Sequence, residues 1–235
     1  MIFQDIFLTN LKQAGITLTD TQISQFVKYY DLLTETNKVM NLTALTEPED
    51  VAVKHFIDSL SAYDTAMHNA TLADVGTGAG FPGVPLKIFD SSIKLTLLDS
   101  LAKRLKFLDT LTAELGLQNV TTIHARAEDA GKDKNLREQF DFVTARAVAR
   151  LNVLAEFCLP LVKVGGKFIA MKADSEEEIT EAENATNLLG GKIAEIKNVK
   201  LPNLEDKRTL VIIEKIKTTP NKYPRKAGTA AKEPL

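Results

Sequence analysis

A glycine-rich turn is the part of the sequence whose residue types point most directly to ligand binding. Residues 72–75 form a short apolar run with the length of a buried strand, and Gly76, Gly78 and Gly80 follow it. Glycines at such a turn let the backbone approach a ligand closely and adopt positive φ angles that a side chain disfavours. The spacing is G-x-G-x-G, because Phe81 stands where a dinucleotide-binding turn has its third glycine, so a pyrophosphate fits poorly. On its own the turn is equally compatible with a purely structural role.

Acidic residues follow the next two expected strands. Asp99 ends the apolar run 95–98, about twenty residues beyond the glycine turn, and there a carboxylate can accept hydrogen bonds from both hydroxyls of a ribose. A helix N-cap is the alternative role for Asp99, although Ser100 could take it instead. Residues 124–129, after the third strand, offer a backbone amide and a carboxyl group to an adenine edge. A strand, a glycine turn and two strand-end acids in this order predict a site for a nucleoside cofactor.

A parallel sheet is needed to bring these residues together. From residue 71 onward, short apolar runs alternate with helical segments, which is typical of a doubly wound α/β domain with helices on both faces of the sheet. Five or six strands are expected, at 72–75, 95–98, 120–123, 142–144, 168–171 and 209–213. The intervening helices are expected near 85–89, 102–115, 151–161 and 176–189.

Three parts of the chain are expected. Residues 1–65 form an N-terminal helical extension packed on the main domain, residues 66–217 form that domain, and residues 218–235 form a basic tail. In the extension, Thr19 and Gln22 predict a capping box at the start of the second helix. Thr46, followed by Pro48, predicts a third helix that begins in the same way and runs toward Leu60.

Composition limits the class of protein. The net charge is -2, from 29 basic and 31 acidic residues, so nucleic acid cannot be bound through overall positive charge and any RNA contact must be local. The single cysteine, Cys158, excludes an internal disulfide framework and a cysteine-rich metal site; it lies in an apolar helical segment and is expected to be buried. The sequence shows no signal peptide and no apolar run of roughly 20 residues. We therefore expect a cytoplasmic protein that does not associate with a membrane, and we expect no bound metal ion.

Several strings of residues are typical of one family. They are Asn-Leu-Thr-Ala at 41–44, Lys-His-Phe-Ile-Asp-Ser-Leu at 54–60, the segment 74–85, Phe-Val-Thr-Ala-Arg-Ala-Val-Ala at 142–149 and Tyr-Pro-Arg-Lys-Ala-Gly at 223–228. The order of motifs resembles that of the seven-stranded S-adenosylmethionine-dependent methyltransferases. Within that group, the chain resembles the bacterial 16S rRNA guanine-N7 methyltransferases, formerly called glucose-inhibited division protein B, over nearly its whole length.

The resemblance implies a Rossmann-like, seven-stranded class I methyltransferase fold with S-adenosyl-L-methionine as its cofactor. It also implies methyl transfer to N7 of a guanine, position 527 in that family, and a monomer whose partner is 16S rRNA or a precursor of the small ribosomal subunit. The residues expected to contact or surround the cofactor are Gly76, Gly78, Gly80, Phe81, Asp99, Ala127, Glu128 and Arg146.

Guanine N7 carries an in-plane lone pair and needs no deprotonation before it attacks a sulfonium methyl group. We therefore expect catalysis by positioning alone, with no catalytic acid or base and with Arg146 as the candidate positioning residue. Methylation of an exocyclic amine is disfavoured, because residues 144–147 read Thr-Ala-Arg-Ala in place of an Asp/Asn-Pro-Pro-Tyr/Phe string. Methylation of cytosine C5 needs a thiolate, and a buried Cys158 disfavours it.

Arginines and the basic tail are the candidates for RNA contact, since a guanidinium group can grip phosphate or the O6/N7 edge of guanine. Arg150 is instead expected to be solvated at the surface or to form an ion pair, and His55 is either a polar contact in the site or a helix-packing histidine. The tail could clamp a phosphate strand and stack a base, or be disordered. The expected RNA-binding residues are Arg126, Arg208, Lys222, Tyr223, Arg225 and Lys226.

Three other functions remain open at this point. A nicotinamide-dependent oxidoreductase shares the glycine turn and the strand-end acid, but this chain lacks the third glycine position and a clear catalytic Lys/Tyr or His pair. A non-catalytic ribosome-assembly factor would be expected to lose Gly76, Gly78, Gly80 and Asp99, all of which are present. A methyltransferase that acts on another RNA is the third possibility.

Overall fold

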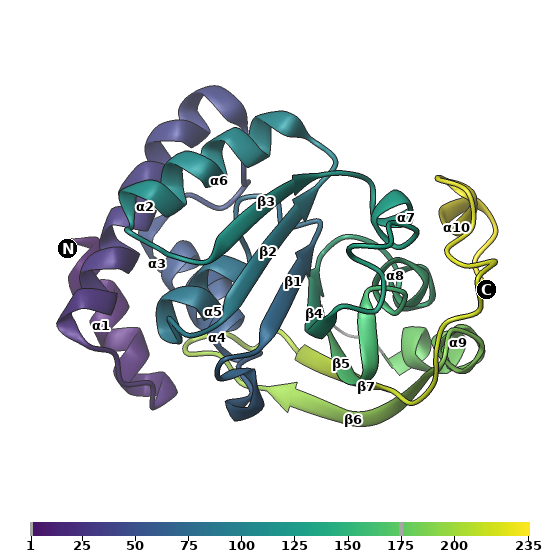
Figure 1. Ribbon diagram of the computed structural model, residues 1–235. Helices are drawn as coiled ribbons and strands as arrows, with labels where there is room; N and C mark the ends of the chain where they lie inside the picture. Colours follow the sequence, from purple (N-terminus) through teal and green to yellow (C-terminus); the bar gives the residue numbers. More distant parts are fainter. Residues whose placement is uncertain (1, 174–175) are drawn as a thin grey trace.

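The structure, a computed structural model, describes residues 2–173 and 176–235. In these ranges seven strands form one sheet, in the order β3-β2-β1-β4-β5-β7-β6 (Figure 1). The first five strands are parallel, and β7 is antiparallel to both of its neighbours. The strands are β1 (Thr71–Val75), β2 (Lys94–Asp99), β3 (Val120–His124), β4 (Phe140–Arg146), β5 (Val162–Lys172), β6 (Gly191–Val199) and β7 (Arg208–Lys215).

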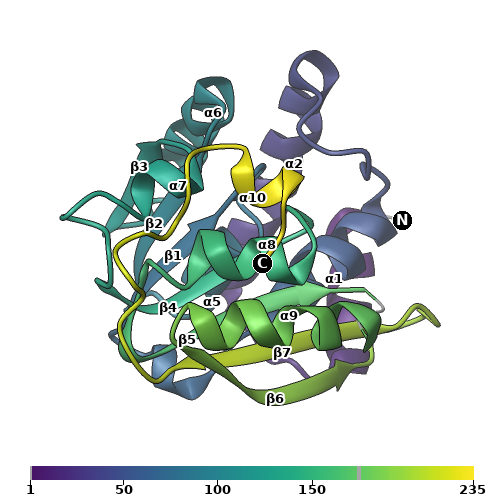
Figure 2. The same ribbon diagram turned by 90° about the vertical axis from the view of Figure 1, so that its right-hand side faces the viewer.

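Helices cover both faces of the sheet. One layer contains α1 (Phe3–Ala14), α2 (Asp20–Met40), α3 (Pro48–Asp50), a π-helix (Val51–Ile57), α4 (Asp58–Leu60), α5 (Gly83–Phe89) and α6 (Ala102–Glu114), with a short 3-10 helix at Thr65–Met67. The other layer, which faces the viewer in Figure 2, contains α7 (Ala127–Ala130), α8 (Leu151–Cys158), α9 (Glu176–Leu188) and α10 (Thr229–Lys232). The strands of a sheet that is covered on both faces are buried on both sides, so the side chains of successive residues pack into the hydrophobic cores on opposite faces of the sheet. Leu72 of β1 packs in the first layer and Ala73 in the second.

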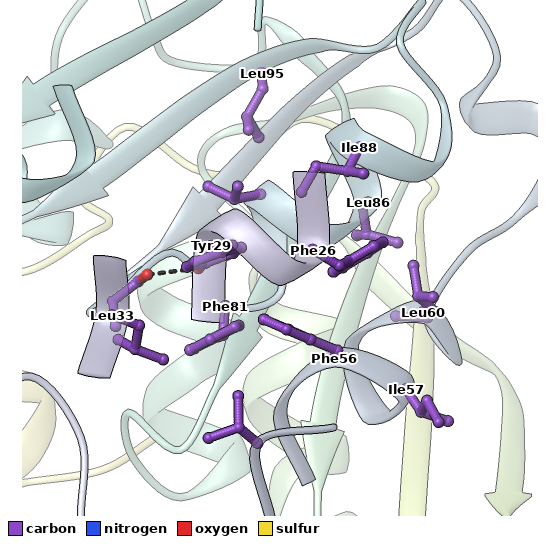
Figure 3. Close-up of a cluster of buried hydrophobic side chains, with 14 of the residues drawn as sticks. Phe26, Tyr29, Leu33, Phe56, Ile57, Leu60, Phe81, Leu86, Ile88 and Leu95 are labelled. Carbon is purple, nitrogen blue, oxygen red and sulfur yellow. Dashed lines mark hydrogen bonds between the residues drawn. The ribbon is translucent and has the colours of Figure 1, made fainter. Parts of the chain in front are cut away.

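An aromatic cluster joins the N-terminal helices to the glycine turn. Phe26 and Tyr29 of α2 and Phe56 of the π-helix are fully buried, and Phe81 lies against them (Figure 3). The Tyr29 hydroxyl donates a hydrogen bond to the carbonyl oxygen of Ala79 at 2.6 Å. Burial of each large apolar side chain contributes about 2 kcal/mol, so this cluster fixes the N-terminal helices to the turn strongly.

Most expected elements are confirmed, with three differences. All six expected strands are present, and β6 is an additional edge strand that pairs only with β7. The Thr19–Gln22 capping box is confirmed. The third N-terminal helix is present and reaches Leu60, but its expected cap, Thr46, was wrong: Glu47 is the N-cap, without a side-chain hydrogen bond, and the helix is a π-helix from Val51 to Ile57. The helix expected to reach residue 161 ends at Cys158, because Val162 already begins β5.

None of the helices in the described ranges is long and apolar enough to cross a membrane.

Candidate functional site

Two adjoining cavities lie at the carboxyl ends of β1, β2 and β4, where doubly wound sheets bind their ligands. The first has a volume of about 610 Å³ and the second of about 420 Å³. Gly76, Arg104 and Ala147 line both of them. The glycine turn therefore forms the boundary between two neighbouring binding spaces.

The second cavity brings together residues from three separate strand ends. Its lining includes Gly76 after β1, Asp99 at the end of β2, and Ala127 and Glu128 after β3. Asp99 is buried and accepts hydrogen bonds from the backbone N–H of Gly78 at 3.0 Å and of Leu101 at 2.9 Å. Asp99 also forms an ion pair with Arg104, whose Nη1 is 3.3 Å from Asp99 Oδ2.

A buried carboxylate that sequence analysis did not single out holds the glycine turn in place. Asp74 of β1 is fully buried and accepts hydrogen bonds from Thr77 Oγ1 at 2.7 Å, from the Gly83 N–H at 2.9 Å and from Thr144 Oγ1 at 3.2 Å. Burial raises the pKa of Asp74 to about 6, although these three donors act in the opposite direction. The sequence indicated a special role for Asp74 only through the presence of an acidic residue inside an apolar strand. Gly83 has to be glycine, because a Cβ there would lie 2.9 Å from Asp74 Oδ2.

The three glycines of the turn have different surroundings. All three have positive φ, at 69° for Gly76, 60° for Gly78 and 105° for Gly80. Gly76 and Gly78 line the first cavity. Gly80 lines neither cavity; a Cβ there would lie 2.6 Å from the Tyr29 hydroxyl, so this glycine permits close packing of α2. Cofactor contact by Gly80 stays a prediction.

The first cavity contains a stack of aromatic and charged groups. The His55 ring stacks on Phe81 with 4.4 Å between ring centroids, and the Arg146 guanidinium lies 5.0 Å from the centroid of the same ring. Arg146 Nη1 also donates to Asp58 Oδ2 at 2.8 Å, and both partners are largely buried. The π-helix and the start of α4 present Lys54, His55 and Asp58 to this cavity. Of these three, only His55 was considered for the site from the sequence, as one of two alternatives.

His55 connects this stack to the loop before the π-helix. Its Nδ1 lies 3.3 Å from Arg146 Nη2, and its Nε2 lies 2.8 Å from Thr43 Oγ1. Burial lowers the pKa of His55 to about 3, and the positive charge of Arg146 adds to this effect. The imidazole is therefore neutral at physiological pH, and both of its nitrogens face a partner.

The low pKa of His55 predicts a pH-dependent contribution to stability. Between pH 6.5 and 3 the unfolded chain binds a proton at this residue and the folded chain does not, so the stabilisation is complete above about pH 6.5 and is lost as the pH falls. We expect the free energy of unfolding of wild type to fall by about 2 kcal/mol more than that of His55→Gln between pH 7 and pH 5. Urea unfolding at the two pH values measures this difference. Exposed His124 supplies the control His124→Gln, and parallel pH profiles for wild type and His55→Gln would contradict the assignment.

Two of the expected RNA-binding arginines lie at the cavities. Arg208 lines the first cavity, with its Nε 4.0 Å from Asp58 Oδ1. Arg126 is exposed and lines the second cavity. Arg150 forms a surface ion pair with Glu181 at 2.5 Å, one of the two expected alternatives. Cys158 is buried as expected, and its pKa is raised well above the ordinary value by burial.

The C-terminal tail is part of the folded site. It passes beside α7 and α8 and ends in α10 (Figure 2). The Gly228 N–H donates to Glu128 Oε1 at 2.9 Å, and Gly228 and Ala231 line the second cavity. The tail therefore completes the wall of the cavity that contains Asp99.

The basic residues of the tail fall into two groups. Tyr223 is buried, and Arg225 donates through its backbone N–H, Nε and Nη2 to Glu156 of α8, whose side chain is only 1% exposed. Lys222 and Lys226 are exposed. The side chains of Tyr223 and Arg225 are thus engaged within the fold, and of the four expected RNA contacts in the tail only the two lysines present their charge to solvent.

No group of three or more His, Cys, Asp or Glu side chains within residues 2–173 and 176–235 is arranged to hold a metal ion.

Comparison with known proteins gives consistent matches. Residues 22–211 match the family model described as rRNA small subunit methyltransferase G. A ribosomal RNA small subunit methyltransferase G of Lactobacillus johnsonii is 51% identical, with 98% of this chain and 99% of the relative covered. One of Alkaliphilus metalliredigens is 52% identical, with 95% of each covered, and one of Clostridium botulinum is 49% identical over the full length of both.

Solved structures with low sequence identity share the fold. A SAM-dependent methyltransferase from Aquifex aeolicus has a TM-score of 0.54 at 18% identity, with 74% of this chain and 96% of that chain covered. A 16S rRNA (adenine(1408)-N(1))-methyltransferase from Catenulisporales acidiphilia has a TM-score of 0.54 at 15% identity, with 66% and 89% covered. The Rossmann-like, seven-stranded class I methyltransferase fold expected from the sequence is confirmed.

Proposed function

Because the chain belongs to the rRNA small subunit methyltransferase G family, we propose that it methylates N7 of guanine 527 in 16S rRNA. The chain is an S-adenosylmethionine-dependent methyltransferase of small-subunit ribosomal RNA. The identity of the target base, guanine 527, and of the methylated atom, N7, is what we propose beyond this activity. The observation that carries the proposal is the pair of cavities that meet at Gly76, which gives a cofactor and a base separate spaces with one common boundary.

The second cavity fits the adenosine part of the cofactor. Asp99 presents a buried carboxylate at the end of β2, the position from which such a group can bind ribose hydroxyls. Ala127 and Glu128 lie after β3, where an adenine edge would meet a backbone amide and a carboxylate. Gly76 has no side chain to obstruct the passage into the first cavity. When bound, S-adenosylmethionine supplies an electrophilic methyl group on a sulfonium centre.

The first cavity suits a reaction that needs no proton transfer. Guanine N7 attacks with its existing lone pair, so the protein has to hold N7 in line with the methyl group and the sulfur atom and prevent other orientations of the base. Phe81 and Arg146 form a flat, rigid wall for this purpose. His55 does not have a nitrogen free to act as a base, because one faces Arg146 and the other faces Thr43. We therefore assign Arg146 a positioning role.

Contact with RNA is proposed for Arg126 and Arg208, which line the cavities, and for the exposed tail lysines Lys222 and Lys226. Such a local patch compensates for a net charge of -2. The target guanine has to be exposed in a loop or splayed out, because the major groove of A-form RNA is too deep and narrow for side chains to reach N7. We expect Lys222→Gln combined with Lys226→Gln to weaken RNA binding and to reduce its dependence on salt, as measured by titration at several salt concentrations.

Mass spectrometry tests the proposed reaction directly. Small-subunit particles from a strain that lacks this enzyme are incubated with the protein and isotopically labelled S-adenosylmethionine, and the nucleosides are then analysed. We expect label in 7-methylguanosine at a single position. Label in another nucleoside would contradict the choice of N7, and no label despite measured cofactor binding would contradict the choice of 16S rRNA.

A further inference from the structure

A chain of hydrogen bonds in the first cavity begins at Asp58. This carboxylate is buried and accepts from Arg146 Nη1 at 2.8 Å, which fixes the orientation of the guanidinium group. The same Nη1 lies 3.1 Å from the carbonyl oxygen of Lys54. A guanidinium group has five donors and no acceptor. Every group that faces Arg146 within hydrogen-bonding distance therefore has to accept from it.

This requirement determines the tautomer of His55. Its Nδ1 faces Arg146 Nη2 at 3.3 Å, so Nδ1 carries the lone pair. The single proton of the neutral ring is then on Nε2. Stacking on Phe81 holds the plane of the ring, and the contacts of its two nitrogens with Arg146 and Thr43 fix the orientation within that plane.

The chain continues to the hydroxyl group of Thr43. His55 Nε2 lies 2.8 Å from Thr43 Oγ1 and donates to it. The backbone N–H of Leu45 donates to the same oxygen at 3.1 Å. Both lone pairs of this oxygen are thus occupied, and the hydroxyl can form another hydrogen bond only as a donor. Thr43 lines the first cavity, and within the described part of the chain its proton has no acceptor.

We infer that Thr43 is a specificity-determining residue whose hydroxyl donates a hydrogen bond to O6 of the target guanine, an inference that rests on the proposed function. O6 and N7 are adjacent acceptors on one edge of guanine, whereas adenine presents an amino donor at position 6. A hydroxyl that can act only as a donor forms a hydrogen bond with O6 of guanine, but it cannot form one with the amino group of adenine. The positioning residues are then Asp58, Arg146 and His55, because their hydrogen bonds leave the Thr43 hydroxyl free to act only as a donor toward the base.

The test uses two target bases that both retain N7. Reconstituted small-subunit particles carry either guanine or 2,6-diaminopurine, in which an amino group replaces O6, at the target position. The ratio of kcat/KM for the two bases is measured for each variant, so that a general loss of activity cancels. We expect this ratio to be about 10-fold higher for wild type than for Thr43→Val, in keeping with the loss of one hydrogen bond. Thr43→Ser retains the hydroxyl and should keep the ratio within about 3-fold of wild type.

Thr46→Val is the matched control, because Thr46 lies on the same loop, is not part of the lining of the first cavity, and accepts from Tyr30 through its carbonyl oxygen, which the substitution retains. Its ratio should equal that of wild type, and cofactor affinity should be the same in all variants. Equal ratios for wild type and Thr43→Val, with guanine N7 still methylated, would overturn the role of Thr43 and leave the proposed function intact. Failure of wild type to methylate guanine N7 would overturn both.

Discussion

We expect Arg225→Met to lower the free energy of unfolding by about 3 kcal/mol, although Arg225 belongs to a basic tail. The reason is its partner Glu156, whose side chain is almost completely buried in α8 and receives four hydrogen bonds from Arg225, three of them from the guanidinium group. Removal of the guanidinium group leaves a buried carboxylate without a compensating charge, which is costly. Urea unfolding at pH 7 measures the change.

Neighbouring lysines provide the control for this substitution. Lys222→Met and Lys226→Met remove one positive charge each from the same tail, but both side chains are exposed. We expect each to change the free energy of unfolding by no more than about 0.5 kcal/mol. If Arg225→Met is no more destabilising than these two, the ion pair does not anchor the tail. Weaker binding of S-adenosylmethionine by Arg225→Met would be a second sign of a displaced tail, since Gly228 lines the cavity that we propose for the cofactor.

The second large effect is expected at the glycine turn, where Gly78→Asp should weaken the binding of S-adenosylmethionine at least about 100-fold. The Gly78 N–H donates to Asp99, and a Cβ at Gly78 would point into open space, with only the carbonyl oxygen of Gly76 at 3.9 Å. Gly78 lines the first cavity, so the new carboxylate would lie where the two cavities meet, close to the charge of Asp99, which accepts from the Gly78 N–H. Two carboxylates in one partly enclosed site repel each other and occupy the space of the ligand. Isothermal titration calorimetry measures the affinity.

Gly116→Asp separates this effect from backbone strain. Gly116 has a φ of 67°, close to the 60° of Gly78, and a Cβ there would meet nothing within 4 Å, so it is as unobstructed as one at Gly78. Both substitutions cost about 1 kcal/mol of stability, because each places a side chain in the left-handed region. Only Gly78→Asp should change cofactor affinity. Equal affinities for the two variants would show that the glycine turn does not contact the cofactor.

The sheet was predictable from the sequence wherever a strand is buried on both faces. Such strands appear as short apolar runs, and all six runs form strands in the structure. β6 lacked this signal because it is an edge strand, and most of its residues, including Lys192, Glu195 and Lys197, face solvent. The π-helix was also missed, since helical spacing in the sequence does not distinguish one kind of helix from another over a single turn.

The site was predictable to the extent that its residues follow strand ends. Gly76, Asp99 and Glu128 come from distant parts of the sequence and line one cavity, as parallel strands require. Asp74 and Glu156 were missed because their partners are set by tertiary packing. The same cause explains why Arg225 was expected at the RNA: its positive charge is visible in the sequence, but the buried carboxylate that neutralises it lies in α8.

The position of Gly228 and Ala231 in the wall of the second cavity has a consequence for biosynthesis. The other walls of this cavity come from the ends of β1, β2, β3 and β4 and from α6 and α8, all of which leave the ribosome before the tail is made. A nascent chain can therefore form most of its sheet while the cavity proposed for the cofactor is still open on one side. Tight cofactor binding, and the stabilisation that a bound ligand gives to the folded state, should begin only after the tail has docked on α7 and α8.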